Sequence, residues 1–288
     1  MSGTGQDTGV RQETDDSQDT SAARRVAATL DLDVTSPTTL ELQVAVARQE
    51  GLQVEESLTC TLDDAPVPLR EVAGTEGSRG HLLEVGSGAL RMTYAATVTG
   101  RAVPAPVSDR DRLVYSRPSR YAPSDSLAAY ATAELGDLPA GPERLAAVST
   151  WVGDRLSYVP GSSSPTDGAV ETLLAGAGVC RDYAHLTIAL LRALDVPARL
   201  VAVYAPGCAP MDFHAVVEAA VDDTWYVLDA TGLAPRTSLL RISTGRDAAD
   251  TAFLTNHGGA LQLRGSEVTA VVDGDLPRDR LHELVALR

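Results

Sequence analysis

Three residues in the second half of the sequence have the types and order that a thiol acyl-transfer site requires, and Cys180 is the first of them. Cys180 follows Gly178-Val179 and opens the best amphipathic stretch of the chain, so it should lie in the first turn of a helix. The partial positive charge and free N–H groups of a helix N-terminus favour a thiolate, and the same N–H groups can bind an oxyanion. By position alone, a small buried side chain remains the simpler interpretation.

The other two residues are His214 and Asp229, which fall on two predicted strands. In the stretch 213–221 the even positions share one face, and in 225–229 the odd positions do. A two-residue turn at 222–223 then places His214 diagonal to Asp229 on the same face, within hydrogen-bonding reach. Thiol, imidazole and carboxylate in this order are typical of a catalytic triad, although a register slip of one residue would separate the pair.

The elements that must position these residues indicate an α+β region. Apolar residues recur at helical spacing after Pro142 and again after Cys180, and alternating or continuous apolar runs follow. The predicted helices and strands are, in chain order, helices at 142–156, 169–174 and 180–194, and strands at 198–204, 213–221 and 225–229. Helices followed by adjacent strands predict helices packed on an antiparallel sheet.

The first part of the chain has a different pattern. Residues 1–22 are polar and acidic and should form a disordered, solvated tail. Short alternating runs separated by Gly, Ser and Pro clusters predict a β-sandwich domain at 23–103, with Cys60 in its core. We expect a linker at 104–123, rich in proline and in solvated arginines, then a catalytic core at 124–265 and a C-terminal strand and tail at 266–288.

The motifs around the three residues resemble the core of the transglutaminase-like superfamily. The similarity covers roughly residues 125–255 and lies in three ordered segments: Gly178-Val179-Cys180-Arg181-Asp182-Tyr183-Ala184-His185, Phe213-His214-Ala215-Val216-Val217-Glu218 and Trp225-Tyr226-Val227-Leu228-Asp229-Ala230-Thr231. The resemblance implies a papain-like fold with a Cys-His-Asp site at Cys180, His214 and Asp229, beside an N-terminal β-domain. Animal transglutaminases add an aromatic side chain to the oxyanion hole; Trp151 and Tyr158 are the nearest candidates here, and neither is assigned that role.

Other residues near the motifs have simpler interpretations. We expect His185 to pack or hydrogen-bond away from the Cys180 face, and Asp182 to complement the helix dipole. Cys208 is interpreted as a loop thiol, with a cleft-lining position as the alternative. The segment 245–250 also resembles bacterial family members, and no chemical role follows for it from the sequence.

Composition restricts the partners. Acidic residues outnumber basic ones by 39 to 24, giving a net charge of −15, so we expect no nucleic-acid or membrane partner. No residue is a lysine, which excludes Walker-type phosphate loops and Schiff-base chemistry. Three widely spaced cysteines predict neither a disulfide framework nor a metal site, and no cofactor is expected. The absence of an apolar leader or span predicts a cytoplasmic protein; the oligomeric state stays open.

Two hypotheses of different class follow. The first is a thiol acyl-transfer enzyme that acts on amide bonds of a peptide or protein substrate, by peptide or isopeptide hydrolysis or by transamidation. The second is a catalytically silent transglutaminase-like module that serves protein–protein binding. The presence of all three triad residues favours the enzyme.

Overall fold

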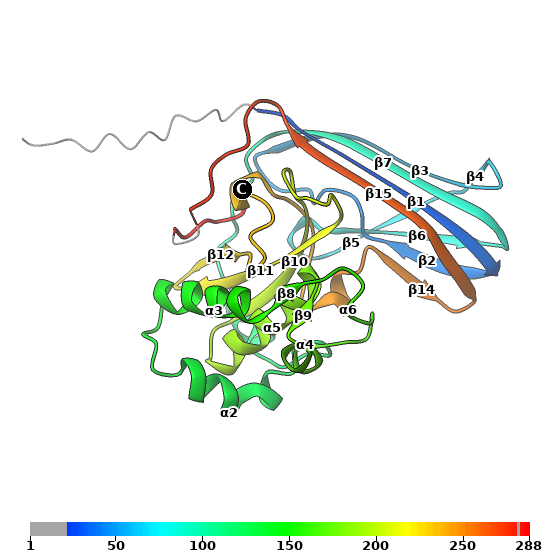
Figure 1. The fold of residues 1–288 in the computed structure, drawn as a ribbon. Coiled ribbons are helices and arrows are strands. Elements are labelled where there is room, and N and C mark those ends of the chain that lie inside the picture. Colours follow the sequence, from blue (N-terminus) through cyan, green and yellow to red (C-terminus); the bar gives the residue numbers. More distant parts are fainter. Residues whose placement is uncertain (1–21, 281–282) are drawn as a thin grey trace, which may run out of the picture.

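The computed structural model describes residues 22–280 and 283–288, so the predicted tail, apart from Ala22, lies outside the described residues. Two antiparallel sheets form the N-terminal part of the described fold, and a helical layer on a third sheet forms the remainder (Figure 1). The first sheet has the order β15-β1-β7-β3-β4 and the second β14-β2-β6-β5. Their strands are β1 (Arg24–Ser36), β2 (Thr38–Leu42), β3 (Leu52–Leu62), β4 (Ala65–Pro66), β5 (Arg70–Ala73), β6 (Arg79–Val85), β7 (Gly88–Gly100), β14 (Leu254–His257) and β15 (Ala260–Val272).

Alternation of apolar and polar residues explains why these strands pack as a sandwich. Every second residue of β1 is buried, and the buried faces of β2, β6 and β7 join the same apolar core. Cys60 lies in this core at 3% exposure, as predicted. The sequence pattern therefore specifies both the strands and the faces that meet.

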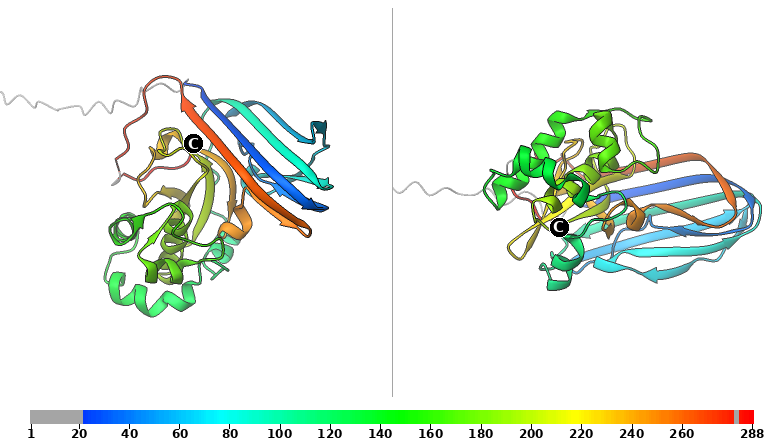
Figure 2. Two further views of the ribbon diagram at one scale, coloured as in Figure 1. Left: turned by 45° about the vertical axis from the view of Figure 1, so that its right-hand side comes forward. Right: turned by 90° about the horizontal axis from the view of Figure 1, so that it is seen from below.

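The strands β14 and β15 belong to this sandwich, whereas the sequence assigned residues 254–265 to the catalytic core. β15 pairs with β1 along nearly its whole length, from Val272 opposite Arg24 to Ala260 opposite Ser36. β14 pairs with β2. In Figures 1 and 2 the orange-red β15 lies beside the blue β1. Pairing between the two ends of a chain is set by tertiary contacts, which local periodicity does not report.

The core that follows is built around a helix whose surface is almost entirely buried. This helix is α5 (Cys180–Ala193), and it packs on the antiparallel sheet β12-β11-β10-β13. The elements of this region are α2 (Ser124–Leu135), α3 (Pro142–Arg155), β8 (Ser157–Tyr158), α4 (Ala169–Ala175), β9 (Ala177–Gly178), β10 (Ala198–Tyr204), β11 (His214–Val221), β12 (Thr224–Leu228), the 3₁₀ turn η2 (Arg236–Ser238), β13 (Leu240–Gly245) and α6 (Ala248–Thr251). The predicted fold class, α+β with helices on an antiparallel sheet, is confirmed.

The predicted linker contains a helix that the sequence analysis missed. Helix α1 (Asp109–Tyr115) begins with a capping box, in which the Ser108 hydroxyl accepts from the Asp111 N–H and the Asp111 carboxylate accepts from the Ser108 N–H. The Ser-x-x-Asp signature was present, but the neighbouring prolines and charges indicated a solvated segment. Its Arg112 bonds to the β11–β12 turn at Asp222 and Asp223, so the segment is anchored to the core.

A buried ion network joins the two regions. Glu218 on β11 accepts from Arg199 on β10 at 2.8 Å and from Arg241 on β13 at 2.7 Å. Burial alone would raise the pKa of Glu218, but the two guanidinium groups lower it to about 2. Arg199 also lies 3.4 Å from Glu76, in the 3₁₀ turn η1 (Thr75–Gly77) of the sandwich. The sheet that carries His214 is thus held in a fixed relation to the N-terminal sandwich.

Candidate active site

The local sequence explains how Cys180 comes to open helix α5. Val179 is the N-cap in extended conformation, and the Asp182 carboxylate accepts from its N–H at 2.8 Å, which closes one side of a capping box. Gly178 fits this turn because a Cβ there would lie 2.6 Å from the Asp182 Cβ. Asp182 therefore has the first-turn role that the sequence predicted. Cys180 itself is half-buried at the helix N-terminus, where free N–H groups and the dipole favour negative charge.

His214 and Asp229 lie together in the structure, as the predicted register required. The ladder between β11 and β12 runs from Val221 opposite Thr224 to Val217 opposite Leu228, with the two-residue turn at 222–223. Asp229 directly follows β12, and its Oδ2 lies 2.8 Å from His214 Nε2. The predicted contact is therefore confirmed.

The carboxylate of Asp229 favours the protonated form of the His214 imidazole. Burial lowers the pKa of His214, but the charge of Asp229 and the hydrogen bond to it raise that pKa well above 6.5, with a further contribution from a hydrogen bond to Cys180. The pKa of Asp229 is raised by burial and lowered more strongly by His214 and by two hydrogen bonds from Thr231. The pair therefore favours imidazolium beside carboxylate, the state in which His214 can donate a proton.

The Cys180 thiol lies close to the same imidazole. Nε2 of His214 contacts Asp229, and Cys180 is near enough to contribute to raising the pKa of His214. The Cys180 thiol is also 3.9 Å from the carbonyl oxygen of Phe213, the residue before His214. The structure thus brings all three predicted residues close to one another.

Of the two aromatic candidates, Tyr158 faces this site and Trp151 does not. Tyr158 ends β8, which pairs in parallel with β9 so that Tyr158 lies opposite Gly178, two residues before Cys180. Burial raises the pKa of Tyr158 to about 12, as do the charges of Cys180 and Cys208, while a backbone hydrogen bond from Cys180 lowers it. Trp151 packs instead against Tyr130 in the helical layer, with ring centroids 5.9 Å apart. Only the position of β8 beside β9 reveals the proximity of Tyr158, and that pairing is tertiary.

Thr231 is a residue whose role the sequence analysis did not identify. Its hydroxyl donates to Asp229 Oδ1 at 2.6 Å, and its N–H donates to the same oxygen at 2.9 Å. These two bonds fix the carboxylate while Oδ2 remains for His214. The Asp-x-Thr spacing is a signal for such a local turn.

The other two thiols differ in their surroundings. Cys208 is buried in the loop before His214, and its thiol contacts the Pro210 carbonyl at 3.4 Å. Burial raises the pKa of Cys208; the charge of His214 lowers it, and those of Cys180 and Asp229 raise it. The predicted loop position is confirmed, and Cys208 is close enough to His214 and Asp229 for their charges to act on its pKa. Burial raises the pKa of Cys60 to about 12, and it lies in the sandwich core.

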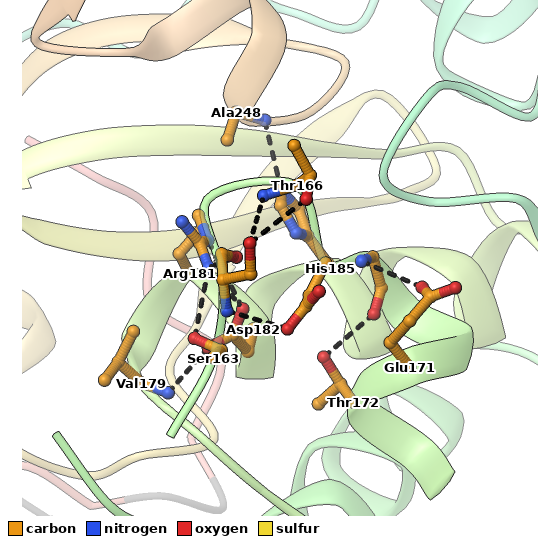
Figure 3. A network of polar contacts seen from close by, with 12 residues as sticks. Ser163, Thr166, Glu171, Thr172, Val179, Arg181, Asp182, His185 and Ala248 are labelled. Carbon is orange, nitrogen blue, oxygen red and sulfur yellow. Dashed lines mark hydrogen bonds and ion pairs between the residues drawn. The ribbon is translucent and has the colours of Figure 1, made fainter. Parts of the chain in front are cut away.

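A polar network beside Cys180 holds the loop that follows Tyr158 (Figure 3). Ser163 donates to Asp182 Oδ2 at 2.5 Å, while Arg181 donates to Ser163 and to the Ser164 carbonyl oxygen. The residues directly after Cys180 therefore anchor residues 163–164. The loop is therefore tied to the N-terminus of α5 by these hydrogen bonds.

No group of three or more His, Cys, Asp or Glu side chains suited to a metal ion occurs within residues 22–280 and 283–288. In the same part of the chain, no helix is both long and apolar enough to cross a membrane.

Comparisons with known proteins agree with this geometry. Residues 125–230 match the family model described as the transglutaminase-like superfamily. A crystal structure named "Putative Cysteine Protease", from Cytophaga hutchinsonii, is 33% identical, with a TM-score of 0.83 over 90% of this chain and 94% of that chain. The chain therefore belongs to the transglutaminase-like superfamily.

Two more distant relatives were found. Uncharacterized protein ML0607 of Mycobacterium leprae is 24% identical over 146 residues, which are 48% of this chain and 52% of that protein, so this chain matches about half of its length. The periplasmic domain of TgpA from Pseudomonas aeruginosa is 17% identical, with a TM-score of 0.39 over 74% of this chain and 88% of that one.

Proposed function

We propose that this protein is a thiol acyl-transfer enzyme that acts on amide bonds of a peptide or protein, with Cys180 as nucleophile, His214 as proton carrier and Asp229 as the residue that orients His214. The observation that carries the proposal is the 2.8 Å contact between His214 Nε2 and Asp229, with Cys180 close enough to the same ring to raise its pKa. Such a three-membered chain at a helix N-terminus is what thiol catalysis requires.

The proposed reaction begins with attack of the Cys180 sulfur on the amide carbonyl carbon. The carbonyl oxygen gains the negative charge, which the Cys180 N–H at the start of α5 can stabilise. Tyr158 is proposed as a second donor: its hydroxyl oxygen accepts from the Cys180 N–H in the free protein, and both groups turn to the oxyanion when the substrate displaces that bond. Collapse of the intermediate breaks the C–N bond while His214 gives its proton to the leaving amine, and a thioester on Cys180 remains.

The second half of the reaction depends on the acceptor. Water, deprotonated by His214, gives a carboxylic acid and frees the thiol, which is hydrolysis. An amine gives a new amide, which is transamidation. We favour hydrolysis of peptide or isopeptide bonds, in line with the protease name carried by the Cytophaga hutchinsonii relative.

A labelled amine distinguishes the two outcomes. The sequence contains no lysine, so the protein offers no side-chain amine for cross-linking to itself. Incubation with a peptide library and fluorescent cadaverine should cleave peptides without incorporating label if the enzyme is a hydrolase. Label on glutamine-containing peptides would instead establish transamidation.

The alternative function, a catalytically silent module for protein binding, is opposed by the intact set of three residues. Trapping separates the two hypotheses. An acyl-enzyme on Cys180, found by mass spectrometry after quenching at acidic pH, would support the enzyme and identify the substrate. A wild-type Cys180 that alkylates no faster at pH 6 than free cysteine, with no acyl adduct, would support the binding module.

A cytoplasmic place of action is part of the proposal, because a reducing compartment keeps Cys180 as a free thiol. All three cysteines, Cys60, Cys180 and Cys208, are free thiols in the structure. Fractionation of cells that express a tagged protein tests this; recovery with periplasmic or secreted proteins would contradict it.

A further inference from the structure

The segment Gly245–Asp250, for which no chemical role follows from the sequence, contacts the helix that carries Cys180 at two points. The Ala248 N–H donates to His185 Nε2 at 3.2 Å, as Figure 3 shows. Arg192, seven residues further along α5, donates to the Arg246 carbonyl oxygen at 2.7 Å. Seven residues are about two turns, or about 10 Å along the axis, so the two contacts lie on one face of α5.

Other bonds make this segment a rigid partner. Asp247 is buried, and its carboxylate accepts from the Tyr121 N–H at 2.8 Å and from the Ala249 N–H at 2.9 Å. Arg246 bonds to Asp250 through its backbone N–H and its guanidinium. A Cβ on Gly245 would lie 2.3 Å from the Asp250 Cβ, so this turn requires glycine.

His185 lies at the centre of these contacts. The imidazole is fully buried, and the Tyr121 ring stacks on it with centroids 5.2 Å apart. The Tyr121 carbonyl oxygen in turn accepts from the Ala169 N–H at the start of α4. The contact with Ala248 uses Nε2 as an acceptor, which requires the proton to be on Nδ1, and Nδ1 has no hydrogen-bond partner among the described residues.

We propose that Gly245–Asp250 is a positioning clamp for the nucleophile helix, and that His185 is a positioning residue that works only as the neutral Nδ1–H tautomer. The clamp fixes the rotation and the axial position of α5, and so the distance from Cys180 to His214 on the sheet. The inference rests on the proposed role of Cys180 as nucleophile. Protonation of His185 would place a second N–H against that of Ala248 and break the contact.

The charged groups around His185 come from two elements. Burial lowers the pKa of His185 to about 4, Arg181 and Arg192 on α5 lower it as well, and Asp247 on the clamp and Asp182 on α5 raise it. Both acids already accept N–H bonds, from Tyr121 and Ala249 and from Val179 respectively. The neutral form is therefore stable at neutral pH and is lost in acid.

The first test measures the rate at which iodoacetamide alkylates Cys180, with the site located by mass spectrometry. His185→Leu removes the acceptor and should slow alkylation at pH 7 by about tenfold to a hundredfold, because a displacement near 1 Å costs up to about 10²-fold. Gly245→Ala should give the same loss without a change on α5. His185→Gln, which keeps an acceptor oxygen and cannot titrate, should restore most of the rate.

Thr187→Val is the matched control, since Thr187 is equally buried on α5 and its hydroxyl bonds only within the helix, to the Tyr183 carbonyl oxygen.

Wild-type Cys180 should lose reactivity between pH 5 and 4 more steeply than Cys180 in the His185→Gln protein does. Identical pH profiles for these two proteins, or equal rates for His185→Leu and Thr187→Val in folded protein, would overturn the proposal.

The second test is independent of the thiol. Imidazole ¹⁵N shifts of the wild-type protein should show His185 as the Nδ1–H tautomer, neutral down to about pH 4. An Nε2–H tautomer, or a cationic His185 at pH 7, would refute the clamp even if Cys180 is reactive. An unreactive wild-type Cys180 with the expected His185 tautomer would refute the proposed function and leave the clamp contact established.

Discussion

Two buried histidines, His185 on helix α5 and His214 on strand β11, are held in different charge states. His214 is 2% exposed and His185 is 0% exposed, so burial is nearly the same for both. The pKa of His214 is raised well above 6.5, whereas that of His185 is lowered to about 4. The difference therefore lies in the atom that meets Nε2: a carboxylate oxygen for His214 and a backbone N–H for His185.

The comparison shows how one fold separates a chemical role from a mechanical one. A buried imidazole next to a hydrogen-bond acceptor keeps a proton that it can donate, whereas one next to a donor acts as the acceptor. Protonation of the second imidazole breaks its hydrogen bond. The first arrangement suits a group that moves protons, and the second suits a fixed contact. Five substitutions would test this distinction.

The largest effect on the turnover rate is expected from removing the proposed nucleophile, Cys180. Cys180→Ala should lower the turnover rate by about 10⁶-fold, the scale on which loss of a nucleophile acts in known triads, with little change in melting temperature. Single-turnover cleavage of a substrate found by acyl trapping measures the rate. Cys60→Ser, in the sandwich core, is the control; an equal loss in both variants would mean that Cys180 is not the nucleophile.

Replacing the carboxylate should make the surroundings of His214 more like those of His185. Asp229→Asn should lower kcat/KM by about 10²- to 10⁴-fold, and the pKa of His214 should fall because the charge that raises it is gone. The pH–rate profile and imidazole NMR shifts measure the two effects. Asp223→Asn, on the exposed turn of the same hairpin, should change neither; an unchanged His214 pKa in Asp229→Asn would contradict the comparison.

The two histidines should also influence folding stability in opposite directions. The folded pKa of His185, about 4, lies below the unfolded value of 6.5, so the unfolded state binds more protons between these values and stability falls as the pH decreases through that window. His185→Gln should remove about 3 kcal/mol of this pH dependence in the free energy of unfolding. Urea unfolding between pH 4 and 7 measures it.

For His214 the sign is reversed, because its folded pKa is raised. Its contribution is fully present below pH 6.5 and is lost as the pH rises through the folded value. His214→Gln should therefore flatten the stability curve on the alkaline side and leave the acid side unchanged. Flattening on the same side by both variants would show that the two sites do not differ as described.

The smallest effect on kcat/KM is expected from removing the hydrogen bond that the Thr231 hydroxyl donates to the Asp229 carboxylate. Thr231→Val removes the hydroxyl bond to Asp229 and keeps the backbone bond, so about 1–2 kcal/mol of stabilisation of the pair should be lost. The expected result is a decrease in kcat/KM of about tenfold. Thr224→Val, at the far end of β12, should have no such effect; equal kcat/KM in the two variants would argue against a role for Thr231.

Local patterns in the sequence predicted the triad because each member lies where local physics can be recognised. Helix α5 begins at Cys180 as predicted, and the short turn at 222–223 sets the register that brings His214 to Asp229. Alternation likewise predicted the sandwich strands, although Ser108 and Asp111 show that a capping signature can be missed among prolines. Helix α2 was missed too, because its Ala-rich sequence has little amphipathic contrast.

The sequence by itself determined most of the sandwich strands, the helix and strands that carry the three clustered residues, the buried faces of these elements and the identity of those residues. These follow from spacings of two to four residues and from one tight turn. The tertiary structure alone decided that β15 completes the N-terminal sheet, that Tyr158 lies beside Cys180, and that Ala248 donates to His185. Each of these joins residues 22 to 248 positions apart. Such contacts depend on how whole elements pack, and local periodicity carries no information about that.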